Sequence, residues 1–422
     1  MQAWMRPPFL FGLMMSLLLS FSFPGKASAP EDWVRVRLLK DLKKVEIYGI
    51  DLQVRERNLK SILRAKPVAV PRMIFEKITV EPVTLQGKKF FKVSERDRGI
   101  NKVKIIAGPF LEMQGDQLLL AGLAVPSRVL LQLRQGRVDV IGALPLEEYL
   151  AGVLTSEMPS SWPLEALKAQ AVAARSYTLA VMHERADQPF HVESTVHDQV
   201  FKHKSRPRRE LPKYRQAERA LRETQGIFLQ EKSSQQTVKS FYHSDCGGIT
   251  RSAKSVWGSG SQQGAVVDQS CPQNPKARWS LTLSQRDLSQ KMRKLIPNGG
   301  LIKSISPTFL EKGEEKVILG LASGEKKSVR ANDLRATLGF DRLKSTRFQV
   351  QTLNEGFVFQ GLGFGHGVGL CQWGARALAS RGLSYLQILS HYYSFAALSS
   401  PSQNVAIRLE SRQNTKSEEN YN

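Results

Sequence analysis

The sequence predicts an α+β protein, in which a β-rich N-terminal region is followed by a mixed α/β domain. Apolar and polar residues alternate in short runs between about residues 33 and 135, as in "VRVRLL" and "KVEIYGIDLQV", which is typical of strands joined by hairpins. After Pro145 the apolar residues follow helical spacing, and from residue 216 strand-like and helical runs mix. A chain of 422 residues, 41% of them hydrophobic, can form roughly two or three domains.

The first 29 residues have the layout of a secretory signal peptide. Arg6 precedes an apolar stretch at 9–23, and small residues follow at Gly25, Ala27 and Ala29. Cleavage after Ala27 and cleavage after Ala29 both fit, and an uncleaved anchor is the alternative. No later segment reaches the roughly 20 apolar residues that a membrane helix needs. We therefore expect export to the periplasm or cell envelope, with no transmembrane helix in the mature protein.

The remaining chain is expected to form three parts. These are a β-rich region at 30–130, a second domain at 131–396 and a flexible polar tail at 397–422. The tail is expected to be flexible because it is polar and follows the last helical pattern.

The formal charge of +23 favours polyanionic partners. An exported protein meets the polymers of the cell envelope rather than chromosomes, so no nucleic-acid partner is expected. A solvated basic surface is the alternative. The densest basic run, "KHKSRPRRELPKYR" at 202–215, contains two prolines and lacks the interleaved aromatic residues that single-stranded nucleic acid requires. It is expected to be an exposed loop.

The stretch "PLEEYLAGVLTSEM" predicts a helix from Pro145 to about Ser156, because Pro159 disfavours its continuation. Glu157 should then lie at the helix end among apolar neighbours. Burial there would raise the pKa of the carboxyl group, as would the negative end of the helix dipole, and this would suit a general acid. A surface or capping glutamate is the alternative.

A second helix is expected from about Pro163 to Met182. Lys168 and Arg175 are seven residues apart, which places them on a common face of this helix. They could form a positively charged wall beside Glu157 that binds anionic or polar groups. Two solvated helix charges are the alternative.

His243 in "FYHSDCGG" and His366 in "GFGHGVG" are flanked by glycines near strand-like runs, so they are candidates for the lining of a cleft, or else structural residues. A helix should begin near Cys371, and Ser384 with Gln387 predicts a capping box that opens a last helix. The glycine-rich turn is a weak match to a nucleotide fingerprint, and no G-x-S-x-G elbow is present. No cofactor is predicted.

The three cysteines allow several arrangements in an exported protein. Cys246 and Cys271 both lie in turn-rich segments, which favours a disulfide between them, with Cys371 buried and reduced. A metal site using His243 and Cys246, and three free thiols, are the alternatives. No metal is predicted, because a structural zinc needs four ligands and only one His-x-x-Cys pair is visible.

Three blocks of the sequence, taken together, carry a family resemblance. They are "EEYLAGVLTSEMPSSWPLEALKAQAVAARSYTLA", "FYHSDCGGIT" and "GFGHGVGLCQWGARALASRGLSYLQILSHYYS". They resemble the SpoIID/LytB family of stage II sporulation protein D lytic transglycosylases and amidase enhancers, and they occur in the family's order. The resemblance covers roughly residues 130–395, so the second domain is expected to be SpoIID-like.

The resemblance implies roles for named residues. It makes Glu157 of the "EMP" motif the catalytic acid and implicates Lys168 and Arg175 in the same site. His243, His366, Gln372 and Trp373 are expected in or beside the glycan cleft, as substrate-binding residues. Some sporulation members bind zinc through a Cys/His cluster, but this sequence lacks the nearby His-Cys partner pair, so a Cys246–Cys271 disulfide is the better expectation.

The implied activity is cleavage of the β-1,4 bond between N-acetylmuramic acid and N-acetylglucosamine in peptidoglycan, leaving a 1,6-anhydro product. Members of the family can prefer strands stripped of stem peptides. Glycosidases typically use two carboxylates, but a lytic transglycosylase can use one, first as acid and then as base. Glu165, the nearest other candidate downstream, lies in a first helical turn and is better explained as a dipole partner.

A second hypothesis is a non-catalytic modulator, which binds cell-wall glycan or an N-acetylmuramoyl-L-alanine amidase and stimulates the amidase. The LytB side of the family implies this function. A third hypothesis is a purely structural wall-binding protein that uses the β-rich region.

Overall fold

The computed structural model describes residues 33–408, apart from 58–76, 98–99, 204–213, 261–263, 270, 272–273, 276, 309–313 and 401–402. The expected signal peptide and most of the basic run at 202–215 lie outside the described residues. The described part of the chain contains no helix with the length and apolar character to cross a membrane. Strands dominate up to residue 145 and helices mix with strands after it, which confirms the α+β class.

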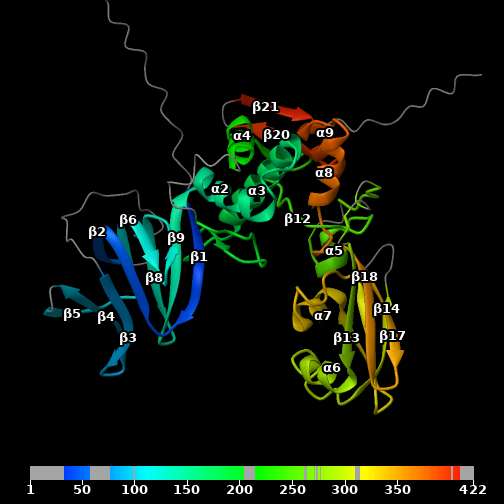
Figure 1. Cartoon of the computed structure of the whole chain (residues 1–422), viewed down its shortest axis with the longest axis horizontal. Helices are drawn as coiled ribbons and strands as arrows, with labels where there is room; N and C mark the ends of the chain where they lie inside the picture. Colours follow the sequence, from blue (N-terminus) through cyan, green and yellow to red (C-terminus); the bar gives the residue numbers. More distant parts are fainter. Residues whose placement is uncertain are drawn as a thin grey trace, which may run out of the picture. The chain divides into compact units, whose positions relative to one another are not determined.

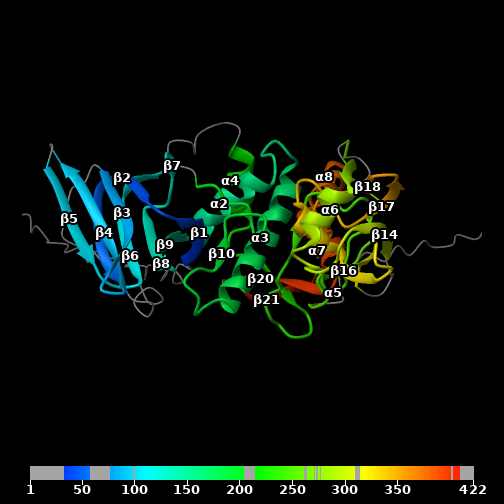
Figure 2. The same ribbon diagram turned by 90° about the horizontal axis from the view of Figure 1, so that it is seen from below.

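The N-terminal region forms one large, mainly antiparallel sheet (Figures 1 and 2). Its strands are β1 (Trp33–Leu42), β2 (Val45–Arg57), β3 (Lys77–Leu85), β4 (Lys88–Asp97), β5 (Ile100–Ile106), β6 (Phe110–Leu120), β7 (Leu123–Ala124), β8 (Arg128–Arg134) and β9 (Arg137–Pro145). They lie in the order β10-β1-β9-β8-β6-β2-β3-β4-β5, with β7 beside β6, and β10 (Val192–Glu193) pairs parallel to β1. The expected boundary at residue 130 falls inside β8, and the sheet continues to Pro145.

Alternation of apolar and polar residues gives this sheet a buried face. In β2, Val45 and Ile47 are buried, whereas the next residue, Tyr48, is 39% exposed. Successive side chains of a strand point to opposite faces of the sheet, so this alternation is expected. β3 packs on β9 and β4 on β8, so the apolar residues of these strands share one core. This face of the sheet therefore has its own core, whereas Val34, Val36 and Leu144 belong to the core of the helices.

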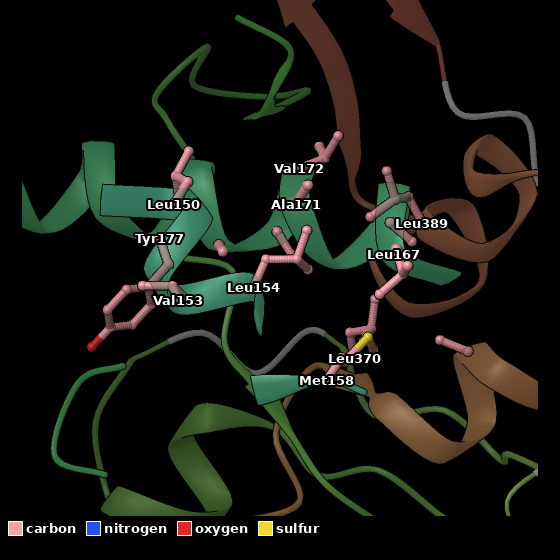
Figure 3. Close-up of a cluster of buried hydrophobic side chains, with 14 of the residues drawn as sticks. Leu150, Val153, Leu154, Met158, Leu167, Ala171, Val172, Tyr177, Leu370 and Leu389 are labelled. Atoms are coloured by element: carbon pink, nitrogen blue, oxygen red, sulfur yellow. The ribbon is translucent and has the colours of Figure 1, made fainter. Parts of the chain in front are cut away.

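Two helices follow the sheet directly. α2 (Leu146–Glu157) and α3 (Leu164–Glu184) begin and end within two residues of the predicted positions. The alanine-rich α3 is buried along most of its length, because small side chains let α2, α4 (Arg215–Glu223), α8 (Gln372–Ser380) and α9 (Tyr385–Tyr392) approach it. Figure 3 shows the apolar side chains of α2 and α3 meeting Leu370 and Leu389 in this core.

The two C-terminal helices begin as the sequence predicts. Cys371 is the N-cap of α8, and its Sγ accepts a hydrogen bond from the backbone N–H of Gly374. Ser384 and Gln387 form a complete capping box at the start of α9. These caps place the segment after the glycine-rich turn against α3.

A region with its own core lies between the second and third sequence blocks (Figure 1). It contains β13 (Arg278–Ser284), α6 (Gln285–Met292), β14 (Ile302–Thr308), β15 (Lys316–Leu321), β16 (Lys326–Arg330), α7 (Ala331–Leu338), β17 (Phe348–Leu353) and β18 (Gly356–Leu362). Arg278 pairs with Leu362, so the chain enters and leaves this region on neighbouring strands. The predicted domain at 131–396 thus contains an insertion.

The prediction of a flexible tail from residue 397 is wrong for its first part. β20 (Ala396–Ser400) pairs with β11 (Phe228–Glu231) on one side and with β21 (Gln403–Arg408) on the other. Edge pairing with β11 supplies backbone hydrogen bonds that composition alone does not reveal. Residues 409–422 lie outside the described residues.

Candidate active site

A cavity of about 960 Å³ contains four of the predicted site residues. Its lining includes Glu157 at the end of α2, His243 of β12 (Tyr242–His243), His366 of the glycine-rich turn and Gln372, the first residue of α8. These residues come from all three sequence blocks. The fold therefore brings the blocks together around one cavity.

Glu157 is the last helical residue of α2, one position later than predicted. Met158 takes an extended conformation with φ −127° and ψ 142°, and Pro159 follows it, so the helix cannot continue. The chain turns away at this point and leaves the carboxylate at the helix end. Glu157 consequently faces the cavity rather than a helix neighbour.

Two hydrogen bonds hold the Glu157 carboxylate. The backbone N–H of Val200 donates to Oε1 at 2.7 Å, and Nε2 of Gln372 donates to Oε2 at 3.4 Å. Burial raises the pKa of Glu157, while both hydrogen bonds lower it, and burial has the larger effect. The environment therefore favours the neutral acid more than water does, which is the form that can donate a proton.

The N–H donor at Val200 comes from a segment that sequence reasoning did not identify. Oε1 of Gln199 accepts hydrogen bonds from the hydroxyls of Tyr149 and Thr178, both at 2.9 Å, and its Nε2 donates to the Ala174 carbonyl at 3.1 Å. These contacts fix the segment across α2 and α3. The neighbouring N–H is thereby directed at the carboxylate.

Asp198 holds the same segment from its other side. Its carboxylate accepts hydrogen bonds from the Tyr177 hydroxyl, the Arg185 guanidinium and the Glu193 backbone N–H, at 2.8, 2.8 and 2.9 Å. The stretch "HVESTVHDQV" has no helix or strand period, so its sequence offers no signal for this arrangement. Only the tertiary structure places it next to Glu157.

Tyr242 also lines the cavity and lies close enough to Glu157 to sense its charge. Burial raises the pKa of the Tyr242 phenol well above its ordinary value, and the Glu157 carboxylate raises it further. The phenol therefore stays neutral and cannot compete with Glu157 as an ionised base at neutral pH.

Glycines allow the third block to lie against the second. β12 pairs parallel with β19 (Leu370–Cys371). Gly369 has φ 72°, and a Cβ there would collide with the carbonyl oxygen of Phe241; a Cβ at Gly365, with φ 121°, would lie 2.7 Å from Cβ of His243. Larger residues at these positions would separate the two histidines.

The two histidines form a neutral aromatic wall. Nδ1 of His243 lies 3.1 Å from the carbonyl of Val368, and Nδ1 of His366 accepts the Val368 N–H at 3.0 Å. Their ring centroids are 5.5 Å apart, and Trp257 lies 5.3 Å from His366. Burial lowers the pKa of His243 to about 4 and that of His366 further below its ordinary value, so both are neutral at pH 7.

Arg175 does not form the positive wall that the sequence analysis expected. Its side chain is 1% exposed and makes a two-fold hydrogen bond to Glu147 at 2.7 and 2.8 Å, with a third bond to the Ile227 carbonyl at 3.0 Å. It is not among the described residues that line the cavity. The reason is that the α3 face carrying Arg175 packs against α2, whose Glu147 neutralises it.

Lys168 is likewise held away from the cavity lining. Its Nζ lies 2.8 Å from Glu165 and 2.6 Å from Glu223 of α4. Glu165, expected to act as a helix-dipole partner, also accepts the Tyr385 backbone N–H at the start of α9, at 2.7 Å. The two cations share one face, as predicted, but that face joins helices to one another.

Trp373 lies beside the cavity rather than in its lining. Its ring packs edge-on against Trp162 with centroids 5.2 Å apart, and the Arg376 guanidinium lies 4.8 Å from the Trp373 ring centroid. This aromatic pair joins the segment after Glu157 to α8, which supports the position of Gln372.

The expected disulfide is not present in the structure. Cys246, Cys271 and Cys371 are all buried free thiols. The prediction separated Cys371 from the other two, but its Sγ lies 3.5 Å from that of Cys271. The three cysteines meet because β12 and β19 pair, a contact between residues more than 100 positions apart that turn composition cannot predict.

Comparison with known proteins identifies two family models. The model "Stage II sporulation protein" (SpoIID) matches residues 134–230, which include α2, α3 and the segment that contacts Glu157. A second model, a domain of unknown function (DUF8618), matches residues 264–369, which include the inserted region.

Several curated proteins are similar to this chain. An uncharacterised protein of Brachyspira hyodysenteriae is 31% identical over 60% of this chain and 66% of its own length. Stage II sporulation protein D of Bacillus amyloliquefaciens is 31% identical over 59% of this chain and 73% of its own length. The amidase enhancer of Bacillus subtilis is 28% identical over 60% of this chain and 40% of its own length. With the SpoIID model matched across the helix that carries Glu157, the chain belongs to the SpoIID/LytB family.

Proposed function

We propose that this protein is an exported lytic transglycosylase that cleaves the bond between N-acetylmuramic acid and N-acetylglucosamine in peptidoglycan. The observation that carries the proposal is Glu157, a carboxylate whose pKa burial raises, on the wall of a cavity large enough for sugar units. Family membership supports a role at the cell wall. The neutral His243 and His366 and the ring of Trp257 supply apolar faces on which sugars can stack.

The reaction needs one acid that becomes a base. Oε1 of Glu157 accepts the shorter hydrogen bond, so Oε2 carries the proton in the neutral acid. This proton moves to the glycosidic oxygen as the C1–O bond breaks, and N-acetylglucosamine leaves with a hydroxyl group. The C6 hydroxyl of the muramic sugar then attacks C1 and returns its proton to Oε2. No water is consumed: the glycosidic oxygen leaves as a hydroxyl of N-acetylglucosamine, and O6 of the muramic sugar bridges C6 and C1 in the 1,6-anhydro product.

Gln372 and Val200 position the carboxylate for both steps. Their N–H groups stabilise the ionised form that exists between the two proton transfers, while burial stabilises the neutral form before and after. Both protonation states of Glu157 are therefore stabilised by its surroundings, as a single group that performs both transfers requires. Glycan strands, including strands stripped of stem peptides, are the proposed substrate.

The test is mass spectrometry of the products released from intact and amidase-treated sacculi. We expect 1,6-anhydromuramic ends with the wild type and their loss in Glu157→Gln, by at least about 100-fold. Glu148→Gln is the matched control, because Glu148 is on the same helix and is not among the described residues that line the cavity. Unchanged anhydro products in Glu157→Gln would remove Glu157 from the chemistry.

A second candidate function is the stimulation of an N-acetylmuramoyl-L-alanine amidase, favoured by the similarity to the amidase enhancer of Bacillus subtilis. In that case the cavity would bind glycan without cleaving it. The same experiment discriminates the two functions: a modulator releases peptides only when an amidase is added, forms no anhydro ends, and is unaffected by Glu157→Gln.

A further inference from the structure

The three cysteines of the chain converge with one aspartate in a cluster that does not include Glu157. The Sγ atoms of Cys246, Cys271 and Cys371 and a carboxylate oxygen of Asp268 all lie within 4.8 Å of one another. All four residues are at most 5% exposed. They come from three separate segments of the chain: the one after β12, the one before β13 and the N-cap of α8.

The distances match the edges of a tetrahedral metal site. Sγ of Cys371 lies 3.5 Å from Sγ of Cys271, and Sγ of Cys246 lies 3.6 Å from Oδ2 of Asp268. Zinc–sulfur bonds of about 2.3 Å and zinc–oxygen bonds of about 2.1 Å give tetrahedral edges of about 3.8 Å between sulfurs and about 3.6 Å between sulfur and oxygen. A disulfide would require about 2.05 Å and would leave one of the three thiols unpaired.

Backbone N–H groups surround two of the sulfurs. Gly248 N–H donates to Sγ of Cys246, while Cys246 N–H and Gly374 N–H donate to Sγ of Cys371, each at 3.3 Å. Cys371 also lies at the N-terminus of α8, where the helix dipole favours negative charge. Donors of this kind stabilise thiolates, which are the form that ligates a metal ion.

The oxygen ligand is itself oriented by a neighbour. The Tyr392 hydroxyl donates to Oδ2 of Asp268 at 2.6 Å, the type of outer contact that fixes a ligating carboxylate. Without metal, the Cys271 thiol donates to Oδ1 of Asp245 at 2.9 Å. On ligation this proton and those of the other two thiols leave to solvent.

We propose that Cys246, Asp268, Cys271 and Cys371 form a zinc site. Three thiolates and one carboxylate complete four-coordination and leave no position for water or substrate, so the site is structural. Thiolates select zinc over hard cations such as magnesium and calcium. The proposal is independent of the reaction at Glu157.

The ligand set differs from the Cys/His pattern that the family resemblance suggested. Nδ1 of His243 is directed at the Val368 carbonyl, and His243 is not part of the cluster. Cys371 directly precedes Gln372, whose amide contacts Glu157. An ion at this site would therefore fasten the start of α8 to the β12 segment and keep Gln372 in place.

Metal content is the direct test, measured by inductively coupled plasma mass spectrometry on the mature protein purified from the periplasm. We expect about one zinc per chain, three thiols that alkylate only after denaturation and chelation, and no disulfide under non-reducing conditions. Native mass spectrometry of the same sample before and after chelation should show the loss of one ion. A Cys–Cys bond, or three thiols that take up no added zinc, would overturn the proposal.

Variants locate the ion. Cys271→Ser and Asp268→Asn should reduce bound zinc at least tenfold, while Asp187→Asn, an exposed carboxylate outside the cluster, should keep it. If the cysteine variant does not fold, cobalt(II) titration of the chelated wild type decides, because a tetrahedral thiolate site gives intense sulfur-to-cobalt absorption. Zinc retained in both ligand variants, or the absence of that absorption, would contradict the site.

Discussion

At the scale of single residues, the surroundings of Glu157 shift the pKa of its carboxyl group in opposite directions. Glu157 is half-buried at the end of α2, which raises its pKa, and receives two N–H groups, which lower it. A carboxylate that is stabilised in both forms suits a residue that donates and later accepts a proton. The same balance makes Glu157 costly for folding at neutral pH, as is common at functional sites.

The difference in stability between Glu157→Gln and the wild type should depend on pH. Burial raises the folded pKa of Glu157 above its ordinary value of 4.5, so the stability of the wild type falls as pH rises from 4.5 through the folded pKa. Glutamine cannot ionise. We expect equal melting temperatures near pH 4 and a rise of roughly 1–3 °C for the variant at pH 7, measured by calorimetry. A variant that is less stable at pH 7 than at pH 4, relative to the wild type, would contradict the buried acid.

Gln372→Met tests the second hydrogen bond to the acid. Removing the Nε2 donor destabilises the ionised carboxylate, so the pKa of Glu157 should rise further and the alkaline limb of the kcat–pH profile should move to higher pH. The loss in kcat should stay below about tenfold, because Glu157 remains. Gln360→Met on the exposed side of β18 is the control. An alkaline limb that moves to lower pH would show that Gln372 does not act on Glu157.

At the scale of elements, ion pairs join α2, α3 and α4. Their cations, Lys168 and Arg175, are the residues that the sequence analysis expected to bind substrate. Arg175 is almost completely buried, whereas Glu147 is 36% exposed. An unpaired Glu147 carboxylate can therefore be solvated by water, whereas an unpaired Arg175 guanidinium would stay buried. Lys168 makes the equivalent bridge between α3 and α4 near the surface.

This asymmetry predicts an order of stabilities in urea denaturation. Glu147→Met leaves a buried guanidinium unpaired and should cost about 3–5 kcal/mol, while Arg175→Met leaves a half-exposed carboxylate and should cost about 1–3 kcal/mol. Lys168→Met should cost less than about 1 kcal/mol. If Arg175→Met instead reduces glycan cleavage with unchanged stability, Arg175 contacts substrate and the structural explanation fails.

At the scale of the whole molecule, the chain carries a large formal charge of +23. Cell-wall glycans carry lactyl and peptide carboxylates, so electrostatic attraction can retain the protein at the wall. Strands stripped of peptides carry fewer charges, which suggests that the charge serves adhesion rather than substrate choice.

Pelleting with purified sacculi tests this role of charge. The bound fraction should fall steeply between about 0.05 and 0.5 M salt, because screening shortens the range of attraction between exposed charges. Glu157→Gln should pellet like the wild type at every salt concentration, which separates adhesion from cleavage. Binding that does not depend on salt would exclude an electrostatic role.

The local structure of this protein can be predicted from its amino-acid pattern. The period of two predicts the N-terminal sheet, and helical spacing with Pro145, Pro159 and Pro163 predicts α2 and α3 to within two residues. These features depend on neighbours along the chain, so they can be predicted without the tertiary structure. The family blocks likewise identified Glu157, His243, His366 and Gln372, which the structure brings to one cavity.

Which groups these elements contact depends on how the whole chain packs. Helical spacing placed Lys168 and Arg175 on one face but could not show that carboxylates of α2 and α4 cover it. The Val200 N–H on Glu157 and the meeting of the three cysteines depend on contacts between distant segments. Such contacts follow from the packing of whole elements, and no local pattern in the sequence encodes them.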